Sequence, residues 1–275
     1  MPKAQKKYTA RNNRPGKKRR SGRKPKVVKL RPWSIFVIAV TLVILICLPI
    51  KRSKSIDDHG ARIPEQFHGE FGIDISHNNK GEIIWDSLRV MTDKKGYTVR
   101  DIRAAKDIRP VSFVFIKATE GQGFIDENFK KNWKDAAEHG IERGAYHFFR
   151  SSKDPVRQAN SYIRTVGKLR HSDLPPVLDI ETTHKGITKK QLNEKALTWL
   201  QTVEKHYGRK PIVYTYDSFA KDWLSKEILD NYPIWIAHYE AKSPVFGNWT
   251  YWQFTDKAIV YGVERKVDLS IRRAD

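Results

Sequence analysis

Short apolar runs alternate with amphipathic segments along residues 71–275. Eight of these runs are typical of strands, and they lie at 71–75, 111–118, 144–149, 176–181, 211–215, 233–237, 250–255 and 267–269. Strands that alternate with helices predict a parallel sheet, and eight of them predict that it closes. We therefore expect an α/β fold, a TIM-barrel-like (β/α) barrel. The loops between the last three strands are too short and too rich in Gly and Pro for good helices, so we expect the barrel to be irregular there.

Four helices are predicted between these strands, at 129–140, 154–166, 188–208 and 217–224. Asp154 is a typical N-cap, because Pro155 follows it at the first helical position. Thr188 and Gln191 have the spacing of a capping box. Residues 77–110 are polar with weak periodicity, and we expect helices and a surface excursion in this stretch.

A longer apolar run lies near the N-terminus. Residues 33–50 are eighteen residues without a charge. As a helix they span roughly 27 Å, about the thickness of the hydrocarbon core of a bilayer. We predict a transmembrane helix over residues 32–50. A cleaved signal peptide is the alternative, but the basic region before the run is too long for one and no small-residue cleavage site follows it.

The net charge of +21 is concentrated before this run. Residues 1–31 hold fourteen Lys and Arg and no acid, residues 32–70 are neutral, and the remainder carries +7. The positive-inside rule predicts that residues 1–31 form a cytoplasmic tail, with the rest of the chain on the periplasmic or cell-wall side. We expect the tail to contact anionic membrane lipid and residues 51–70 to be a linker. Nucleic-acid binding by the tail is the alternative, which has little support because Tyr8 is its only aromatic residue.

Acidic residues occupy the predicted ends of several strands. Asp74 lies on the first strand, Asp179 and Glu181 on the fourth, and Asp268 on the last. Asp179 and Glu181 point to the same side, because they are two positions apart on a strand. A single such carboxylate is often a helix cap or an ion-pair partner, but four at the ends where barrels hold active residues predict a catalytic cluster. Like charges held close together raise at least one pKa, as a general acid requires near neutral pH.

Aromatic side chains accompany these acids in or just after the predicted strands. Five of these aromatic residues are candidates to line a substrate groove: Tyr146, Tyr214, Trp235, Tyr239 and Trp252. Aromatic residues on strands are often part of the core. A groove lined by rings and carboxylates nevertheless suits a sugar chain, since rings pack on pyranose faces and carboxylates act on the glycosidic oxygen.

The segments that carry these residues resemble the glycoside hydrolase family 25 lysozymes. Eight motifs follow in the order of that family: Phe71–His77, Phe115–Gly121, Asp126-x-x-Phe129, Gly144–Phe148, Leu178–Glu181, Trp235–Ala237, Trp252–Thr255 and Val267–Leu269. The resemblance covers essentially all of residues 71–275. It implies an irregular β/α barrel that hydrolyses the β-1,4 bond between N-acetylmuramic acid and N-acetylglucosamine in peptidoglycan.

The resemblance also implies roles for the four acids. Glu181 resembles the proton donor, and Asp179 resembles the acid that orients or polarises the 2-acetamido group of the substrate. Asp74 and Asp268 match the other two acids of the cleft. The resemblance leaves two mechanisms open, participation of the acetamido group and direct attack by water, and the separation of the carboxylates that bears on this choice is not contained in a sequence. The stretch 77–110 is longer than the usual first connection of the family, so one rim of the groove is expected to be remodelled.

Other classes of chemistry have little support. The single Cys excludes a disulfide framework and a Cys-rich zinc module, and the nine His lack the spacing of metal ligands. The chain has neither a phosphate-binding loop nor a complete dinucleotide motif, so we expect no cofactor and no metal. The sequence predicts a membrane-anchored muramidase. The alternative is a non-catalytic peptidoglycan-binding module on the same barrel.

Overall fold

The computed structural model describes residues 59–65, 69–79, 81–239 and 243–274. The chain divides into two compact units, residues 1–55 and 56–275, and the described residues all belong to the second. The predicted basic tail and transmembrane segment therefore lie outside the described residues. Within the described part, none of the helices combines the length and the apolar character needed to cross a membrane.

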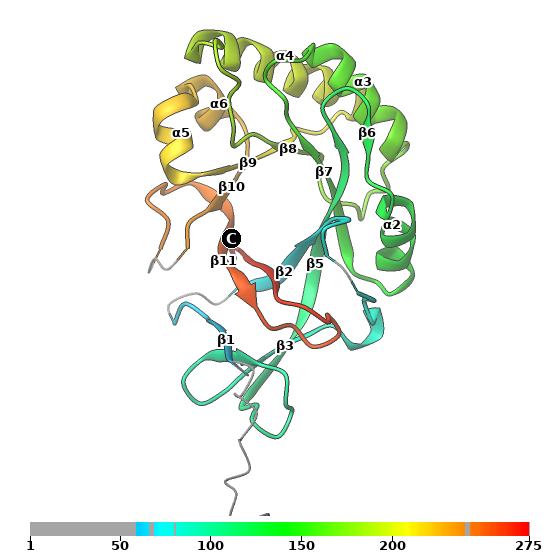
Figure 1. Ribbon diagram of the computed structural model, residues 1–275, viewed down its shortest axis with the longest axis vertical. Coiled ribbons are helices and arrows are strands. Elements are labelled where there is room, and N and C mark those ends of the chain that lie inside the picture. Colours follow the sequence, from blue (N-terminus) through cyan, green and yellow to red (C-terminus); the bar gives the residue numbers. More distant parts are fainter. Residues whose placement is uncertain (1–58, 66–68, 80, 240–242, 275) are drawn as a thin grey trace, which may run out of the picture. The chain divides into compact units, whose positions relative to one another are not determined.

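Eight strands close into a barrel (Figure 1). They are β2 (Glu70–Ile75), β5 (Asp107–Glu120), β7 (Glu142–Phe148), β8 (Val177–Asp179), β9 (Ile212–Tyr216), β10 (Ile234–Ala237), β11 (Trp249–Ala258) and β12 (Val267–Arg272). Neighbouring strands from β2 through β11 pair in parallel, and β12 closes the ring by pairing antiparallel with both β11 and β2. The eight predicted strands and the irregular end of the barrel are thus confirmed.

Helices cover the outside of the barrel beside the parallel strands (Figure 1). They are α2 (Phe129–Glu138), α3 (Pro155–Val166), α4 (Lys189–Tyr207), α5 (Asp217–Trp223) and α6 (Lys226–Asn231). The side chain of Asp154 caps α3 by accepting a hydrogen bond from the backbone of Arg157, and Thr188 and Gln191 form the predicted capping box of α4. The four predicted helices are confirmed, whereas α6 was not predicted, because its single short turn carries little periodicity.

The interior of the barrel is filled by large aromatic side chains. Phe113 and Phe115 are fully buried, and their rings contact each other edge to face. Two glycines make room for them: a Cβ on Gly72 would lie 2.1 Å from the ring of Phe113, and one on Gly144 would lie 2.5 Å from the ring of Phe115. The centre of the barrel is therefore a packed core, and a ligand has access only to its mouth.

The stretch 77–110 differs from its prediction. It contains β3 (Arg89–Thr92) and β4 (Tyr97–Val99), which pair as an antiparallel hairpin, and its described residues include only one helical turn, Trp85–Ser87. The prediction of helices was therefore wrong. β3 also pairs with the start of β5, and β4 with β1 (His59–Arg62). β1 falls in the segment predicted as a linker, and its polar sequence HGAR gave no strand signal because it pairs on one edge only.

Candidate active site

Asp74 and Asp268 reach the same rim of the barrel from strands of opposite direction. Asp74 lies near the carboxyl end of β2, whereas Asp268 is the second residue of β12. Because β12 runs antiparallel to β2, these two residues are direct partners in the ladder. Opposite residues of such a pair point to the same face. Burial, together with the charge of Asp268, raises the pKa of Asp74 well above its ordinary range, and burial with the charge of Asp256 raises the pKa of Asp268 to about 6.

A buried glutamine connects Asp74 to two tyrosines. Gln253 of β11 is 2% exposed. Its Nε2 donates to Asp74 Oδ2 at 2.8 Å, and its Oε1 accepts from the hydroxyls of Tyr214 at 2.9 Å and Tyr239 at 2.8 Å. Sequence reasoning did not select Gln253. Its signal was a polar residue at an inward-facing position between two aromatic neighbours, Trp252 and Phe254.

Asp179 and Glu181 complete the acidic cluster from the next part of the barrel. Asp179 ends β8, and Glu181 follows it after the fully buried Ile180. Burial and the charge of Glu181 raise the pKa of Asp179 far above its ordinary range, and burial also raises the pKa of Glu181. The charge of Glu181 also acts on Asp74 and Asp268, so the structure brings all four predicted acids together.

Two cations moderate this cluster. Lys117 near the end of β5 is 6% exposed and donates to Glu120 Oε2 at 2.7 Å, and Arg150 binds the other carboxylate oxygen of Glu120. The charges of Lys117 and Arg150 lower the pKa of Glu181, opposing the effect of its burial. Glu120 therefore bridges the two cations that act on Glu181.

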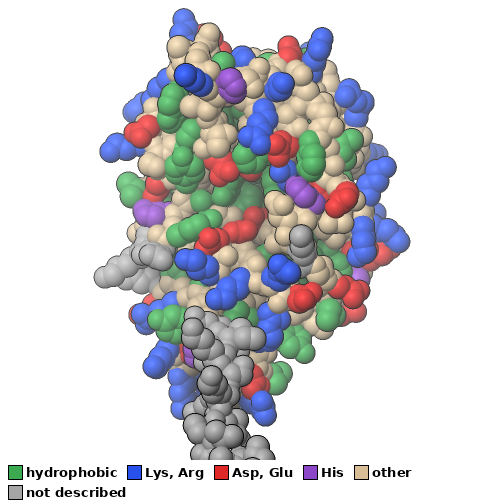
Figure 2. Space-filling view, in the orientation of Figure 1, with side chains coloured by type: hydrophobic (Ala, Val, Ile, Leu, Met, Phe, Trp, Pro, Cys, Tyr) green, Lys and Arg blue, Asp and Glu red, His purple; other side chains and the backbone are tan. Residues whose placement is uncertain are grey.

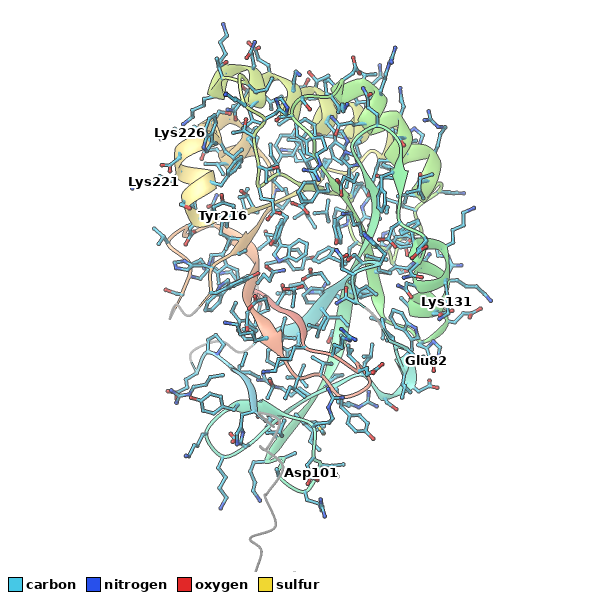
Figure 3. The ribbon with its side chains drawn as sticks, in the orientation of Figure 1. Glu82, Asp101, Lys131, Tyr216, Lys221 and Lys226 are labelled. Carbon is cyan, nitrogen blue, oxygen red and sulfur yellow. The ribbon has the colours of Figure 1, made fainter. Side chains whose placement is uncertain are left out.

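A cavity of about 550 Å³ opens beside Glu181. Its other lining residues come from the ends of β9 and β10 and the start of α5, and they are Tyr214, Tyr216, Asp217, Ser218, Ala237, His238 and Tyr239. Tyr216 lies below α5 in Figure 3. On the face of the molecule shown in Figure 2, acidic side chains gather within a hollow between hydrophobic side chains. The cavity size suits a small number of sugar rings.

The predicted groove residues separate into two groups. Tyr214 and Tyr239 line the cavity, and Tyr146 lies close enough to Asp74 and Asp179 for their charges to help raise its pKa. The structure does not place Trp235 or Trp252 in the groove.

Trp235 is 2% exposed and lies inside the barrel beneath Tyr214. Its ring stacks on Phe115 with the centroids 4.3 Å apart, and its Nε1 donates to Ser270 Oγ. Trp252 is fully buried on the outer side of β11, against Trp249. The alternation along β11 explains this placement, because Gln253 points inward and its neighbour therefore points outward.

Comparison with known proteins identifies the family. The model of the glycosyl hydrolases family 25 matches residues 73–263. The chain belongs to family 25. It is 34% identical over 220 residues to protein YegX of Escherichia coli K12, covering 79% of this chain and 74% of that protein. It is 30% identical to lysozyme M1 of Streptomyces globisporus, covering 74% of this chain and 68% of that one.

Solved structures of this family share the fold of the chain. The bacterial lysozyme of Streptomyces coelicolor superposes with a TM-score of 0.64 at 28% identity, over 76% of this chain and 94% of that one. A family 25 glycosyl hydrolase of Bacillus anthracis superposes with a TM-score of 0.63 at 28% identity, over 79% of this chain and 94% of that one. The chain is therefore a glycoside hydrolase of the lysozyme family. Among its described residues, no group of three His, Cys, Asp or Glu is arranged to hold a metal ion.

Proposed function

We propose that this family 25 enzyme hydrolyses the β-1,4 bond between N-acetylmuramic acid and N-acetylglucosamine in peptidoglycan, with Glu181 as the general acid. The observation that carries the proposal is the position of Glu181. It lines the cavity and its pKa is raised by burial. A carboxyl group with a raised pKa keeps its proton to a higher pH and can donate it to the glycosidic oxygen as the bond breaks.

Asp179 assists in this proposal. Its carboxyl group lies close to Glu181, whose charge adds to burial in raising its pKa. In this proposal the carboxyl group of Asp179 accepts a hydrogen bond from the N–H of the 2-acetamido group and so orients or polarises that group. Asp268, with a pKa of about 6, can ionise near neutral pH and adds negative potential at the same rim, which favours the positive charge that develops on the sugar ring.

The sugar released at the reducing end tests the bond specificity. We expect full-length enzyme to digest purified peptidoglycan and to leave N-acetylmuramic acid at the new reducing ends. N-acetylglucosamine at those ends would assign the enzyme to a different glycosidase class. Binding to insoluble wall without the release of any reducing end would instead indicate a non-catalytic wall-binding module.

We also propose that residues 32–50 anchor the enzyme in the cytoplasmic membrane, with the barrel outside the cytoplasm. The support is the uncharged run 33–50, preceded by fourteen cations in residues 1–31. We expect the chain to remain with membranes after extraction with high salt and to be released by detergent. Protease added outside spheroplasts should degrade the barrel and spare the tail. Release of the whole chain by salt would contradict the anchor.

A further inference from the structure

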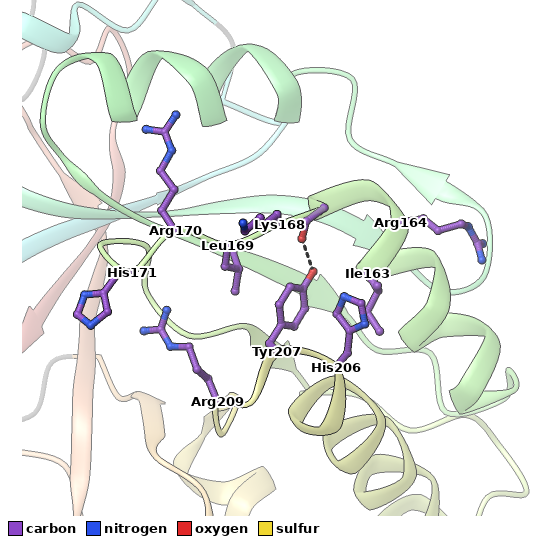
Figure 4. Close-up of a pocket in the computed structure, with 10 residues that line it drawn as sticks. Ile163, Arg164, Lys168, Leu169, Arg170, His171, His206, Tyr207 and Arg209 are labelled. Carbon is purple, nitrogen blue, oxygen red and sulfur yellow. Dashed lines mark hydrogen bonds between the residues drawn. The ribbon is translucent and has the colours of Figure 1, made fainter.

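A second, larger cavity lies at the opposite end of the barrel from the acids. It has a volume of about 810 Å³. Its walls come from the connection between α3 and β8 and from the connection between α4 and β9, both of which lead into the amino ends of strands. We call it the basic cavity; it is lined by Ile163, Arg164, Gly167, Lys168, Leu169, Arg170, His171, His206, Tyr207 and Arg209 (Figure 4).

The lining of the basic cavity carries four permanent positive charges and no carboxylate. The charges belong to Arg164, Lys168, Arg170 and Arg209. Among the residues that the structure describes, no acid forms an ion pair with any of the four, although eleven pairs between Lys or Arg and an acid exist elsewhere in the described part of the barrel domain. The nearby Asp173 is taken by Arg143, at 2.7 Å. Four cations held around one cavity repel one another, and an anion placed there would relieve that repulsion.

Helix ends account for only part of this charge. A cation in the last turn of a helix is favourable by itself, and Arg164 lies in the last turn of α3. Lys168, Arg170 and Arg209 follow the helix ends by two to four residues, so they are not part of the last turns. Lys168 and Arg170 also line an adjoining cavity of about 450 Å³, so the positive surface continues past the basic cavity.

The floor of the basic cavity is apolar and fixed. Ile163, Leu169 and Tyr207 are half-buried, and the hydroxyl of Tyr207 donates to the carbonyl of Gly167 at 2.9 Å. In Figure 4, Tyr207 and Leu169 lie in the middle of the hollow, His171 and Arg209 towards one end, and Arg164 at the other. A ligand that carries an anionic group on an apolar or sugar body matches this combination.

We propose that the basic cavity binds a phosphate ester, at a site separate from the catalytic groove. A phosphate group suits it better than a carboxylate, because its tetrahedral oxygens offer acceptors to more than one cation, and a phosphate monoester also carries a second negative charge. The proposal does not depend on which glycosidic bond the enzyme cleaves. Two sources provide this chemistry: a phosphorylated sugar and the headgroup of an anionic lipid.

The test titrates full-length protein in detergent with four soluble probes, using calorimetry. Glucosamine 6-phosphate is compared with glucosamine, and dihexanoyl phosphatidylglycerol with dihexanoyl phosphatidylcholine. The double variant Lys168→Glu/Arg170→Glu reverses two exposed charges of the cavity that make no side-chain hydrogen bond within the described structure. Lys221→Glu/Lys226→Glu, at exposed positions on α5 and α6, makes the same change in net charge as a matched control (Figure 3).

We expect one of the two phosphate probes that can carry a net negative charge, glucosamine 6-phosphate or the phosphatidylglycerol, to bind saturably. It should bind about tenfold more weakly to the cavity variant than to the control variant. The probe that binds identifies the source, sugar or lipid. Binding should weaken as salt is added, because exposed charges are screened. Equal loss in the two variants would show non-specific attraction to the basic chain and overturn the proposal. The absence of phosphate-dependent binding to unaltered protein would overturn it as well.

Discussion

Asp268 and Asp74 face each other across the antiparallel pair formed by β12 and β2. This is the one place in the barrel where two carboxyl groups of the site are ladder partners. Both have a raised pKa, and the charge of Asp268 is one cause of the shift at Asp74. The two strands that close the barrel thus carry a pair of acids whose simultaneous ionisation is disfavoured, and the stability of the protein should therefore depend on pH.

Asp268→Asn should make the protein more stable near neutral pH. The pKa of Asp268 is raised from 3.8 to about 6 in the folded state. The unaltered protein therefore loses stability as pH rises from about 4 to about 6, because its unfolded state releases this proton first. We expect the variant to lack this loss and to be more stable by up to about 3 kcal/mol at about pH 7. Thermal unfolding of both proteins across this range measures it, and parallel pH profiles would contradict the assignment.

Lys117→Met should move the basic limb of the pH–activity profile to higher pH. The positive charge of Lys117 lowers the pKa of Glu181, so its removal raises that pKa. A general acid with a higher pKa keeps its proton to a higher pH. The control is Lys131→Met, because Lys131 is an exposed residue of α2 (Figure 3). If the limb stays fixed in the Lys117 variant, another group carries the proton.

Gln253→Met should lower kcat by disconnecting Asp74 from Tyr214 and Tyr239. Gln253 donates to the acid and accepts from both hydroxyls, so the apolar replacement leaves three polar groups, two of them in the interior of the barrel, without this partner. We expect a loss of stability of about 1–3 kcal/mol, visible in the melting temperature. We expect the tyrosine hydroxyls to shift their ultraviolet absorbance as well. An unchanged melting temperature and kcat would show that the network is dispensable.

Trp252→Ala and Tyr239→Ala should affect different properties. Trp252 is fully buried, so its truncation should cost about 3–5 kcal/mol of stability. Tyr239 is 40% exposed and lines the cavity beside Glu181, so its truncation should raise KM with little change in melting temperature. Unfolding curves and steady-state kinetics of both variants separate the two roles. A rise in KM confined to the Trp252 variant would show instead that Trp252 contributes to the groove.

Most of the barrel could be predicted because its periodicity is strong. The eight strands are apolar runs, and the caps at Asp154 and Thr188 depend on neighbours close in sequence. The grouping of the four acids at one rim could be predicted because barrels hold their active residues at the carboxyl ends of the strands. Asp268 reaches that rim by a different route, since β12 is antiparallel and presents its amino end.

Other features depend on contacts between distant segments and left no local signal. The hairpin of β3 and β4 is short, and its partners are β1 and the start of β5. The side of a strand on which a ring lies also depends on register, which is why Trp235 and Trp252 were assigned to the groove. The basic cavity forms only when two connections far apart in sequence meet beneath the barrel.

The most direct measurement compares Glu181→Gln with the unaltered full-length enzyme. Glu194→Gln is the matched control, since Glu194 is an exposed residue on α4. We expect Glu181→Gln to lower the rate of reducing-end release from purified peptidoglycan by about 10²–10⁴-fold, with wall binding and melting temperature retained. Turnover equal to that of the control, in a folded protein, would contradict the assignment of Glu181 as the general acid.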